Sequence, residues 1–285
     1  MTHPFSPFCC YNGEFAPFDA VKFGIQNRAF RYGDSVFETF RCFGNQPFLF
    51  DLHYERLMRA MAVTGMQTKR FPTIDVLEKK IESLINKNRY FGSSKVRLSV
   101  FRNDGGLYAP ETNLCSYLIE ASPLDEPSFG LNSKGLIAGI YTSMAKQPSI
   151  ISPFKTGSSM LFVMAGNYRD EHNLSEVLIT NTHGLVVEAL SSNLFWFSND
   201  KLYTPSVDSG CVDGIMRQTI MKVAALHGLK TVEVPGIDPG ALRSVDEVFV
   251  TNSVNGMRWI VGIDEVRYYN IKTRQLFQTF LQTIS

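Results

Sequence analysis

The sequence predicts an α+β fold made of two domains. The chain has 285 residues, which suits one large domain or two of ordinary size. Its predicted strands and helices are mixed without the regular strand–helix alternation of a parallel sheet, which favours α+β. The stretch 121–134 is rich in Pro, Ser, Asp and Gly and has no hydrophobic periodicity, which indicates a linker. We therefore expect an N-terminal α/β domain at 1–120 and a C-terminal domain at 135–285.

Composition and charge narrow the classes of function. Hydrophobic residues make up 44% of the chain, and the formal net charge of +1 gives no electrostatic reason to expect nucleic acid or an anionic membrane as a partner. No apolar run is long enough to span a bilayer, and the first residues lack the basic start and apolar core of a signal peptide. The five cysteines are scattered without Cys-x-x-Cys spacing, so we expect no metal site, no disulfide framework and a cytoplasmic location.

The first domain is expected to combine strands with two helices. Predicted strands, rich in β-formers, are 34–41, 95–102 and 117–120. Asp51 is expected to cap a helix over Leu52–Val63, and Thr73 a second helix with one apolar stripe. His53 and Arg56 are three residues apart, so they are expected to be neighbours on the first helix. By itself, this pattern would make Arg56 half of a surface ion pair.

The second domain is expected to contain short strands and two longer helices. Predicted strands are 136–141, 177–180, 186–188, 194–197 and 247–251. Asn199-Asp200 predicts a tight turn into Leu202-Tyr203. One helix is expected to follow the segment around residue 155 and to end near His172, and another to run from about Ile215 to His227, with Gly228 as its stop.

Lys155 is the first candidate for chemistry. It stands between apolar Phe154 and a run of small residues. A lysine that faces a closed apolar cavity has a lowered pKa, because desolvation disfavours the ammonium form, and a neutral amine is the nucleophile of Schiff-base chemistry. Most lysines are solvated surface groups, so this segment alone also fits an ordinary exposed lysine.

A glycine-flanked loop, Gly210 to Gly214, opens directly into the predicted helix that begins at Ile215. Free backbone N–H groups and the helix dipole make such an end an anion site, although an ordinary helix start with glycines for the turn fits the pattern equally well. No Gly-x-Gly-x-x-Gly follows a strand and no Walker lysine motif occurs, so the sequence does not support nucleotide binding.

Three segments, together with the lysine between the first two, resemble the class IV aminotransferases, the fold-type IV pyridoxal-phosphate enzymes. The segments are 27–41 (NRAFRYGDSVFETFR), 188–195 (EALSSNLF) continuing to 203–217, and 248–253 (VFVTNS). The resemblance runs from about residue 11 to about residue 270 and depends on the combination rather than on one segment. It implies a D-amino acid aminotransferase-like fold with the cofactor between two domains.

The resemblance implies pyridoxal 5′-phosphate as the cofactor. It implies that Lys155 forms the Schiff base and later moves the α-proton, that Glu188 keeps the pyridine nitrogen protonated, and that Arg56 binds the phosphate. The other cofactor-binding residues that it implies are Ser192, Asn193, Ile215 and Met216 through their backbone N–H groups, Asn252 and Ser253. Without the resemblance, Glu188 would be interpreted as a solvated carboxylate on a strand.

The resemblance leaves more than one reaction open, because the family contains aminodeoxychorismate lyases, branched-chain aminotransferases and D-amino acid aminotransferases. All act on an amino group through an external aldimine. Branched-chain enzymes usually have Phe-Glu-Gly where this chain has Phe37-Glu38-Thr39, so the chain looks most similar to the lyase, which releases pyruvate and 4-aminobenzoate in the folate route. The alternative is an aminotransferase for branched-chain or D-amino acids with a 2-oxo acid acceptor.

Candidate substrate-binding residues are Phe37, Thr39, Arg41, Arg97 and Arg102. For each arginine, solvation at a strand edge is nearly as good an interpretation. The resemblance also implies a small-molecule amino substrate and a homodimer. An inactive homologue that serves as a binding or scaffold protein is a remote alternative. The retention of four residue types, at Arg56, Lys155, Glu188 and Ser253, argues against that alternative.

Overall fold

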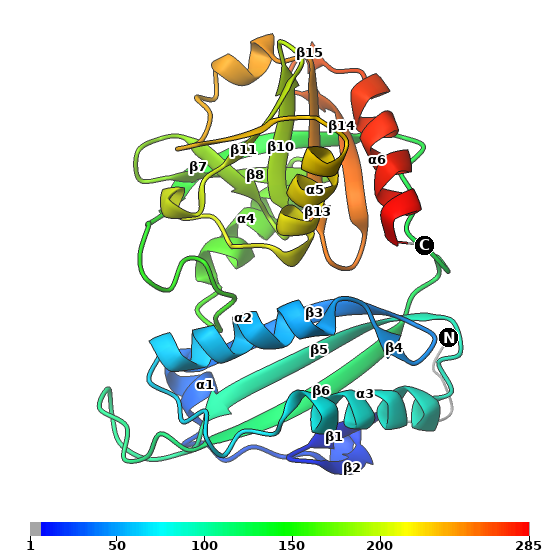
Figure 1. Ribbon diagram of the computed structural model, residues 1–285. Helices are drawn as coiled ribbons and strands as arrows, with labels where there is room; N and C mark the ends of the chain where they lie inside the picture. Colours follow the sequence, from blue (N-terminus) through cyan, green and yellow to red (C-terminus); the bar gives the residue numbers. More distant parts are fainter. Residues whose placement is uncertain (1–6, 285) are drawn as a thin grey trace. The chain divides into compact units, whose positions relative to one another are not determined.

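The computed structural model describes residues 7–284 and divides into two compact units, each with its own hydrophobic core (Figure 1). The first unit comprises the chain up to Ser128 together with Phe154–Ser158. The second comprises Phe129–Pro153 and the chain from Ser159 onward. This division differs from the expected one, because the segment that carries Lys155 packs with the first unit.

The first unit is built on an antiparallel sheet of six strands in the order β2-β1-β6-β5-β3-β4. Its elements are β1 (Phe8–Tyr11), β2 (Glu14–Pro17), α1 (Arg28–Tyr32), β3 (Ser35–Phe43), β4 (Gln46–Pro47), α2 (Phe50–Val63), α3 (Ile74–Asn88), β5 (Ser93–Arg102) and β6 (Cys115–Pro123). Strand β6 therefore continues three residues into the stretch that was expected to be linker.

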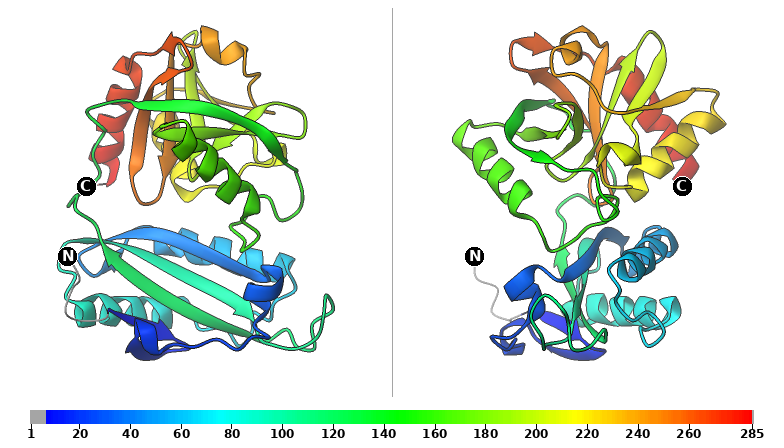
Figure 2. Two further views of the ribbon diagram at one scale, coloured as in Figure 1. Left: turned by 180° about the vertical axis from the view of Figure 1, so that it is seen from behind. Right: turned by 90° about the vertical axis from the view of Figure 1, so that its left-hand side faces the viewer.

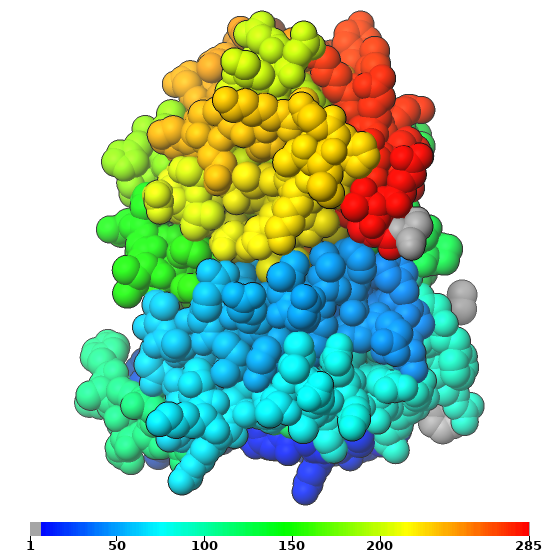
Figure 3. Space-filling model, viewed as in Figure 1, coloured from blue at the N-terminus to red at the C-terminus, as the bar shows by residue number. Residues whose placement is uncertain are grey.

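Helices α2 and α3 cover the same face of this sheet, as the right-hand view of Figure 2 shows, and their side chains hide the sheet in Figure 3. Leu77 and Ile81 of the predicted stripe are fully buried in the first core, with Leu57 and Met61 of α2. Asp51 is not the cap of α2, as had been expected. The helix begins at Phe50, two residues before the expected start, with Leu49 as the cap residue, and Asp51 lies in the first turn, where its negative charge interacts favourably with the helix dipole.

Residues 154–158 join the first unit by backbone pairing along β3. Val36 and Thr156 form an antiparallel bridge, the N–H of Phe37 donates to the Lys155 carbonyl (2.9 Å), and the N–H of Gly157 donates to the Ser35 carbonyl (2.8 Å). The early part of β3 can accept this partner because β4 pairs only with its last two residues. Gly157 suits the contact because a Cβ there would come 2.2 Å from Ser35 Oγ.

The second unit is built on a mixed sheet in the order β12-β11-β10-β13-β14-β7-β8-β9, and a further pairing of β9 with β10 closes six of these strands into a ring. Its elements are β7 (Leu136–Lys146), α4 (Met160–Glu171), β8 (Glu176–Asn181), β9 (Val186–Ala189), β10 (Asn193–Ser198), β11 (Lys201–Pro205), α5 (Ile215–Leu226), β12 (Thr231–Val234), β13 (Glu247–Asn252), β14 (Gly256–Ile263), β15 (Val266–Arg267) and α6 (Ile271–Ile284). Helix α4 lies on one side of these strands, and α5 and α6 lie on the other (Figures 1 and 2).

The predicted turn at Asn199-Asp200 is confirmed. Ser198 pairs with Lys201, and both turn residues have positive φ (49° and 58°), as a two-residue type I′ hairpin requires. Across residues 7–284, no helix has both the length and the apolar character that crossing a membrane would need.

Candidate active site

The first cluster of candidate residues is organised by Glu38, which occupies a core-facing position of β3 between buried Val36 and Phe40. The Glu38 carboxylate accepts hydrogen bonds from Arg56 Nε (2.8 Å) and Arg56 Nη2 (2.6 Å), and it lies 2.7 Å from His53 Nδ1. All three side chains are buried. The partner of Arg56 is therefore a buried carboxylate eighteen residues earlier in the chain and not a surface neighbour.

Charge distribution in this cluster follows from burial and pairing. Burial by itself raises the pKa of Glu38, but Arg56 and His53 outweigh burial and lower this pKa to about 2. Burial lowers the pKa of His53, and the nearby cations Arg56 and Lys155 act in the same direction against the opposing effect of Glu38. A neutral His53 then donates from Nδ1 to ionised Glu38. Its Nε2 is buried and has no hydrogen-bond partner among the described residues.

The opposite side of β3 carries Phe37 and Thr39, because successive side chains of a strand alternate between its faces. Lys155 Nζ lies 4.7 Å from the centroid of the Phe37 ring, and the Arg97 guanidinium lies 3.6 Å from it. Arg97 of β5 stands directly opposite Thr39. The first unit thus brings Lys155, Phe37, Thr39 and Arg97 together. Burial lowers the pKa of Arg97, against the effect of Glu120.

Two of the predicted substrate arginines have other roles in the fold. Arg41 is buried, and its guanidinium donates to Ser93 Oγ (3.4 Å) and to the Glu126 carbonyl. Arg102 is buried against Asp34 (2.9 Å) and also donates to the Thr64 and Gly65 carbonyls. These guanidiniums bind the chain's own oxygens, and a role for either in binding a substrate carboxylate stays a prediction.

The second cluster lies in the second unit and is organised by Glu188 on β9. The Glu188 side chain is buried, whereas the strand pattern alone would suggest a solvated carboxylate. Its Oε2 accepts the N–H of Val212 (2.9 Å), and its Oε1 pairs with Lys146 Nζ. Asn193 Nδ2 donates to the carbonyl of the same Val212 (2.7 Å). Glu188 and Asn193 therefore hold both backbone groups of one residue in the loop that precedes α5.

Cross-strand register places further polar side chains on the same face. Asn193 stands opposite both Glu188 of β9 and Thr251 of β13, and directly opposed residues of antiparallel strands share a face. Thr251 Oγ1 is buried and has no hydrogen-bond partner among the described residues. Beyond Thr251, Asn252 donates to Ser192 Oγ (3.0 Å) and accepts two N–H groups of the following turn, which contains Ser253.

Helix α5 begins at Ile215, and Gly214 precedes it as the N-terminal cap residue. The first-turn N–H groups, those of Ile215 and Met216 included, have no acceptor within the helix, which suits an anion. Gly214 is required by packing, since a Cβ there would come 1.9 Å from Asn193 Oδ1.

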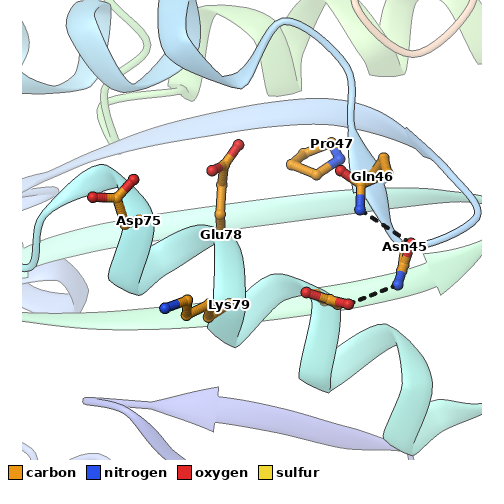
Figure 4. Close-up of a pocket in the computed structure, with 7 residues that line it drawn as sticks. Asn45, Gln46, Pro47, Asp75, Glu78 and Lys79 are labelled. Atoms are coloured by element: carbon orange, nitrogen blue, oxygen red, sulfur yellow. Dashed lines mark hydrogen bonds between the residues drawn. The ribbon is translucent and has the colours of Figure 1, made fainter.

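Sequence reasoning missed Glu38 and Lys146 as parts of these clusters. A signal for Glu38 was present: a carboxylate on the core face of a strand needs a buried cation, and His53 and Arg56 share a helix face. No local pattern marks Lys146. A separate hollow beside α3 and β4, drawn in Figure 4, is lined by Asn45, Gln46, Pro47, Asp75, Glu78, Lys79 and Glu82. It contains none of the predicted site residues, and we assign it no role.

Comparisons with known proteins identify the family of this chain. The family model for class IV amino-transferases matches residues 35–263. The aminodeoxychorismate lyase of Bacillus subtilis is 29% identical over 85% of this chain and 82% of its own length, and the branched-chain-amino-acid aminotransferase of Escherichia coli K12 is 26% identical over 94% and 88%. The crystal structure of the Escherichia coli branched-chain enzyme superposes with a TM-score of 0.87 at 24% identity, over 98% of this chain and 95% of that chain.

The fold and the family model together define the class of protein. The chain belongs to the class IV aminotransferase family and is an enzyme of that family with the fold-type IV architecture. Its relatives in the comparison include both lyases and transaminases. The family resemblance in the sequence is thereby confirmed over most of the chain.

Proposed function

We propose that the chain is a pyridoxal 5′-phosphate enzyme and that each of the two residue clusters contributes cofactor-binding residues. The donor sets fit this group: the Glu188 carboxylate suits a protonated pyridine nitrogen, and the first turn of α5, the unpartnered Thr251 hydroxyl, Ser253 and Arg56 suit a phosphate. The cofactor would supply an electron sink for the substrate carbon that bears the amine.

Lys155, and not Lys146, is proposed as the covalent lysine. The ring nitrogen and the aldehyde-bearing carbon of pyridoxal phosphate occupy opposite positions of the pyridine ring. Because Lys146 Nζ pairs with the Glu188 carboxylate, it belongs to the nitrogen end, away from the aldehyde. Lys155 Nζ would therefore bind the aldehyde carbon and later take the proton from the substrate carbon that bears the amine.

This assignment is tested by reduction with borohydride followed by peptide mapping. The pyridoxyl mark is expected on Lys155 in the wild-type protein, to be absent from the Lys155→Ala variant, and to remain on Lys155 in the Lys146→Met variant. A mark on residue 146 of the wild-type protein would contradict the assignment.

For the reaction, we propose aminodeoxychorismate lyase activity, which yields pyruvate and 4-aminobenzoate. The observation that carries this choice is the Thr39–Arg97 pair beside Phe37. A hydroxyl and a guanidinium, whose Nε donates to Ser99 Oγ (3.1 Å), are suited to a substrate rich in carboxylates, whereas a branched alkyl side chain offers neither group a hydrogen-bond acceptor. The Bacillus subtilis relative carries the same activity in its name.

A turnover assay with two arms separates the alternatives. Supplied with aminodeoxychorismate alone, the enzyme is expected to release pyruvate and 4-aminobenzoate in equal amounts. If product forms only when 2-oxoglutarate or pyruvate is added with an amino acid, the aminotransferase alternative is correct. If neither arm gives product, the inactive binding homologue is favoured.

We further propose a homodimer in a reducing, cytoplasmic setting. Each unit exposes apolar side chains that a partner copy would cover: Phe30, Leu107 and Tyr108 in the first, and Ile150, Met160 and Val163 in the second. The five cysteines are free thiols, and four of them are buried. Light scattering coupled to size exclusion should give twice the chain mass of 32.1 kDa. The mass of a single chain would refute the dimer.

A further inference from the structure

Lys146 is an amine of the Glu188 cluster that the proposed chemistry does not use. It is the last residue of β7, its Nζ pairs with Oε1 of Glu188, and only 11% of its side chain and 3% of that of Glu188 are exposed. The other carboxylate oxygen accepts the N–H of Val212. Both oxygens of Glu188 therefore have donors supplied by the chain itself.

The path of β7 shows how Lys146 reaches this position. The pairing of β7 with β8 is regular up to Tyr141, then shifts register, and resumes where Lys146 stands opposite Asn181. On its other edge, β8 pairs with β9, where Ile179 stands opposite Glu188. The Lys146 ammonium also lies 5.4 Å from the centroid of the Phe162 ring, a distance typical of a cation–π contact.

We propose that Lys146 is a positioning residue that holds the Glu188 carboxylate in place and limits how strongly this carboxylate retains a proton on a pyridine nitrogen. The inference rests on the proposed cofactor. A carboxylate that faces one cation stabilises that cation more strongly than a carboxylate that faces two, because the two positive charges repel each other. Lys146 therefore weakens the electron sink while it keeps Glu188 paired when no cofactor is bound.

The other groups that face this pair do not replace Lys146. Glu188 and Lys146 both act on Cys211, whose pKa is raised to about 11, first by burial and then by Glu188, so that its thiol stays neutral at working pH. Arg217 acts on Cys211, but its guanidinium donates to the Pro205 carbonyl and to Glu233. Within residues 7–284, the other hydrogen-bond partner of Glu188 is the uncharged N–H of Val212.

The test compares the full-length wild-type protein with three variants. Lys146→Met removes the charge at nearly constant length, Lys146→Arg keeps the charge, and Lys222→Met removes an equal charge from the exposed side of α5 as a control. The first measurement is the melting temperature of protein freed of cofactor. The second is the ¹⁵N NMR shift of bound pyridoxal phosphate labelled at the ring nitrogen, followed over a pH titration.

The proposal predicts a distinct pattern. Without cofactor, Lys146→Met should melt several degrees below the wild-type protein, because it leaves a buried carboxylate oxygen without a partner, whereas Lys222→Met should not. With cofactor, Lys146→Met should raise the midpoint of ring-nitrogen protonation by about one pH unit or more, as removal of a neighbouring like charge does. Lys146→Arg should restore the wild-type midpoint. A merely structural lysine would change the melting temperature alone.

The outcomes distinguish this inference from the proposed function. If the wild-type protein retains the labelled cofactor and Lys146→Met has the same midpoint as Lys222→Met, the inference is overturned and the proposed function stands. If the wild-type protein retains no cofactor, the proposed function fails and takes the tuning role of Lys146 with it. Equal melting temperatures of cofactor-free Lys146→Met and wild-type protein would overturn the pairing itself.

Discussion

At the scale of single residues, the first cluster is governed by the cost of burying charge. Glu38, His53 and Arg56 are removed from water together, which is tolerable only because each ionised group faces a partner at hydrogen-bond distance. The bidentate pairing also fixes the plane of the Arg56 guanidinium. Glu38 is thus a support for a proposed phosphate-binding residue as well as part of the core.

Replacing Glu38 by Gln tests this support. The Glu38→Gln variant leaves the buried Arg56 without a counter-charge, and we expect it to lose roughly 3–5 kcal/mol of unfolding free energy. Glu55→Gln, an exposed neighbour on α2, serves as control and should stay within about 0.5 kcal/mol of the wild-type protein. Urea unfolding followed by circular dichroism measures both. Equal midpoints for the two variants would contradict the role of Glu38.

Acid titration gives a second prediction at this scale. The pKa of Glu38 is lowered from 4.5 to about 2 by folding, so its contribution is fully present above pH 4.5 and is lost as pH falls toward 2. The lowered pKa of His53 acts in the same direction below 6.5, since the unfolded chain binds that proton first. The difference in melting temperature between wild-type protein and Glu38→Gln should therefore shrink between pH 4.5 and pH 2. A constant difference in melting temperature from pH 4.5 to pH 2 would contradict the lowered pKa of Glu38.

At the scale of elements, one loop residue ties the start of α5 to the sheet. Val212 is held through its N–H by Glu188 of β9 and through its carbonyl by Asn193 of β10. The helix N-terminus, the proposed phosphate site, is thereby held by β9 and β10, and β9 also carries Glu188, the carboxylate proposed to face the pyridine nitrogen. The alternation of side chains along each predicted strand indicated which residues share a face of that strand. Only the pairing of strands in the structure showed which side chains of different strands meet.

A pair of glycine substitutions tests this placement. Gly214→Ala forces a Cβ to within 1.9 Å of Asn193 Oδ1, so we expect a clear loss of stability and weaker binding of pyridoxal phosphate. Gly166→Ala in α4 meets nothing within 4 Å and should stabilise the protein by about 0.5–1 kcal/mol, as alanine does in a helix. Thermal unfolding and cofactor titration of both variants provide the measurement. If Gly214→Ala behaves like Gly166→Ala, the placement is wrong.

At the scale of the whole molecule, a short piece of chain within the sequence range of the second unit packs with the first unit. Residues 154–158 come after the start of the second unit but belong to the first by their contacts. Two backbone hydrogen bonds with β3, which together form the bridge between Val36 and Thr156, hold this piece, and Lys155 is part of it. The proposed covalent lysine is therefore positioned by the unit that precedes it in sequence.

Splitting the chain tests this arrangement. Fragments 1–128 and 129–285, expressed together with a tag on the first, are expected to copurify, because the second fragment supplies residues 154–158 to the first unit. Gly157→Ala in the second fragment should weaken the association, since its Cβ would come 2.2 Å from Ser35 Oγ. Fragments that separate in native buffer, or that associate equally well with the substitution, would show that this segment does not join the units.

Much of the fold and part of the site could be predicted from the sequence. Periodicity located the strands around Phe37 and Arg97 and the helices α2 and α3 of the first unit, though not α1, because side-chain period is a local property of the chain. The family segments singled out Lys155, Glu188 and Arg56 as candidates. The pairings that could not be predicted join residues far apart in the sequence. No local pattern relates Lys146 to Glu188, or Arg41 to the Glu126 carbonyl.

By itself, the sequence determined the family, the α+β class and the residue types available for chemistry. Only the tertiary structure decided that Arg41 and Arg102 bind the chain's own oxygens, that Glu38 holds Arg56, and that Lys155 packs with the first unit. The physical reason is that a buried charge must find its partner in space. That partner is set by strand register and helix packing, which join residues far apart along the chain.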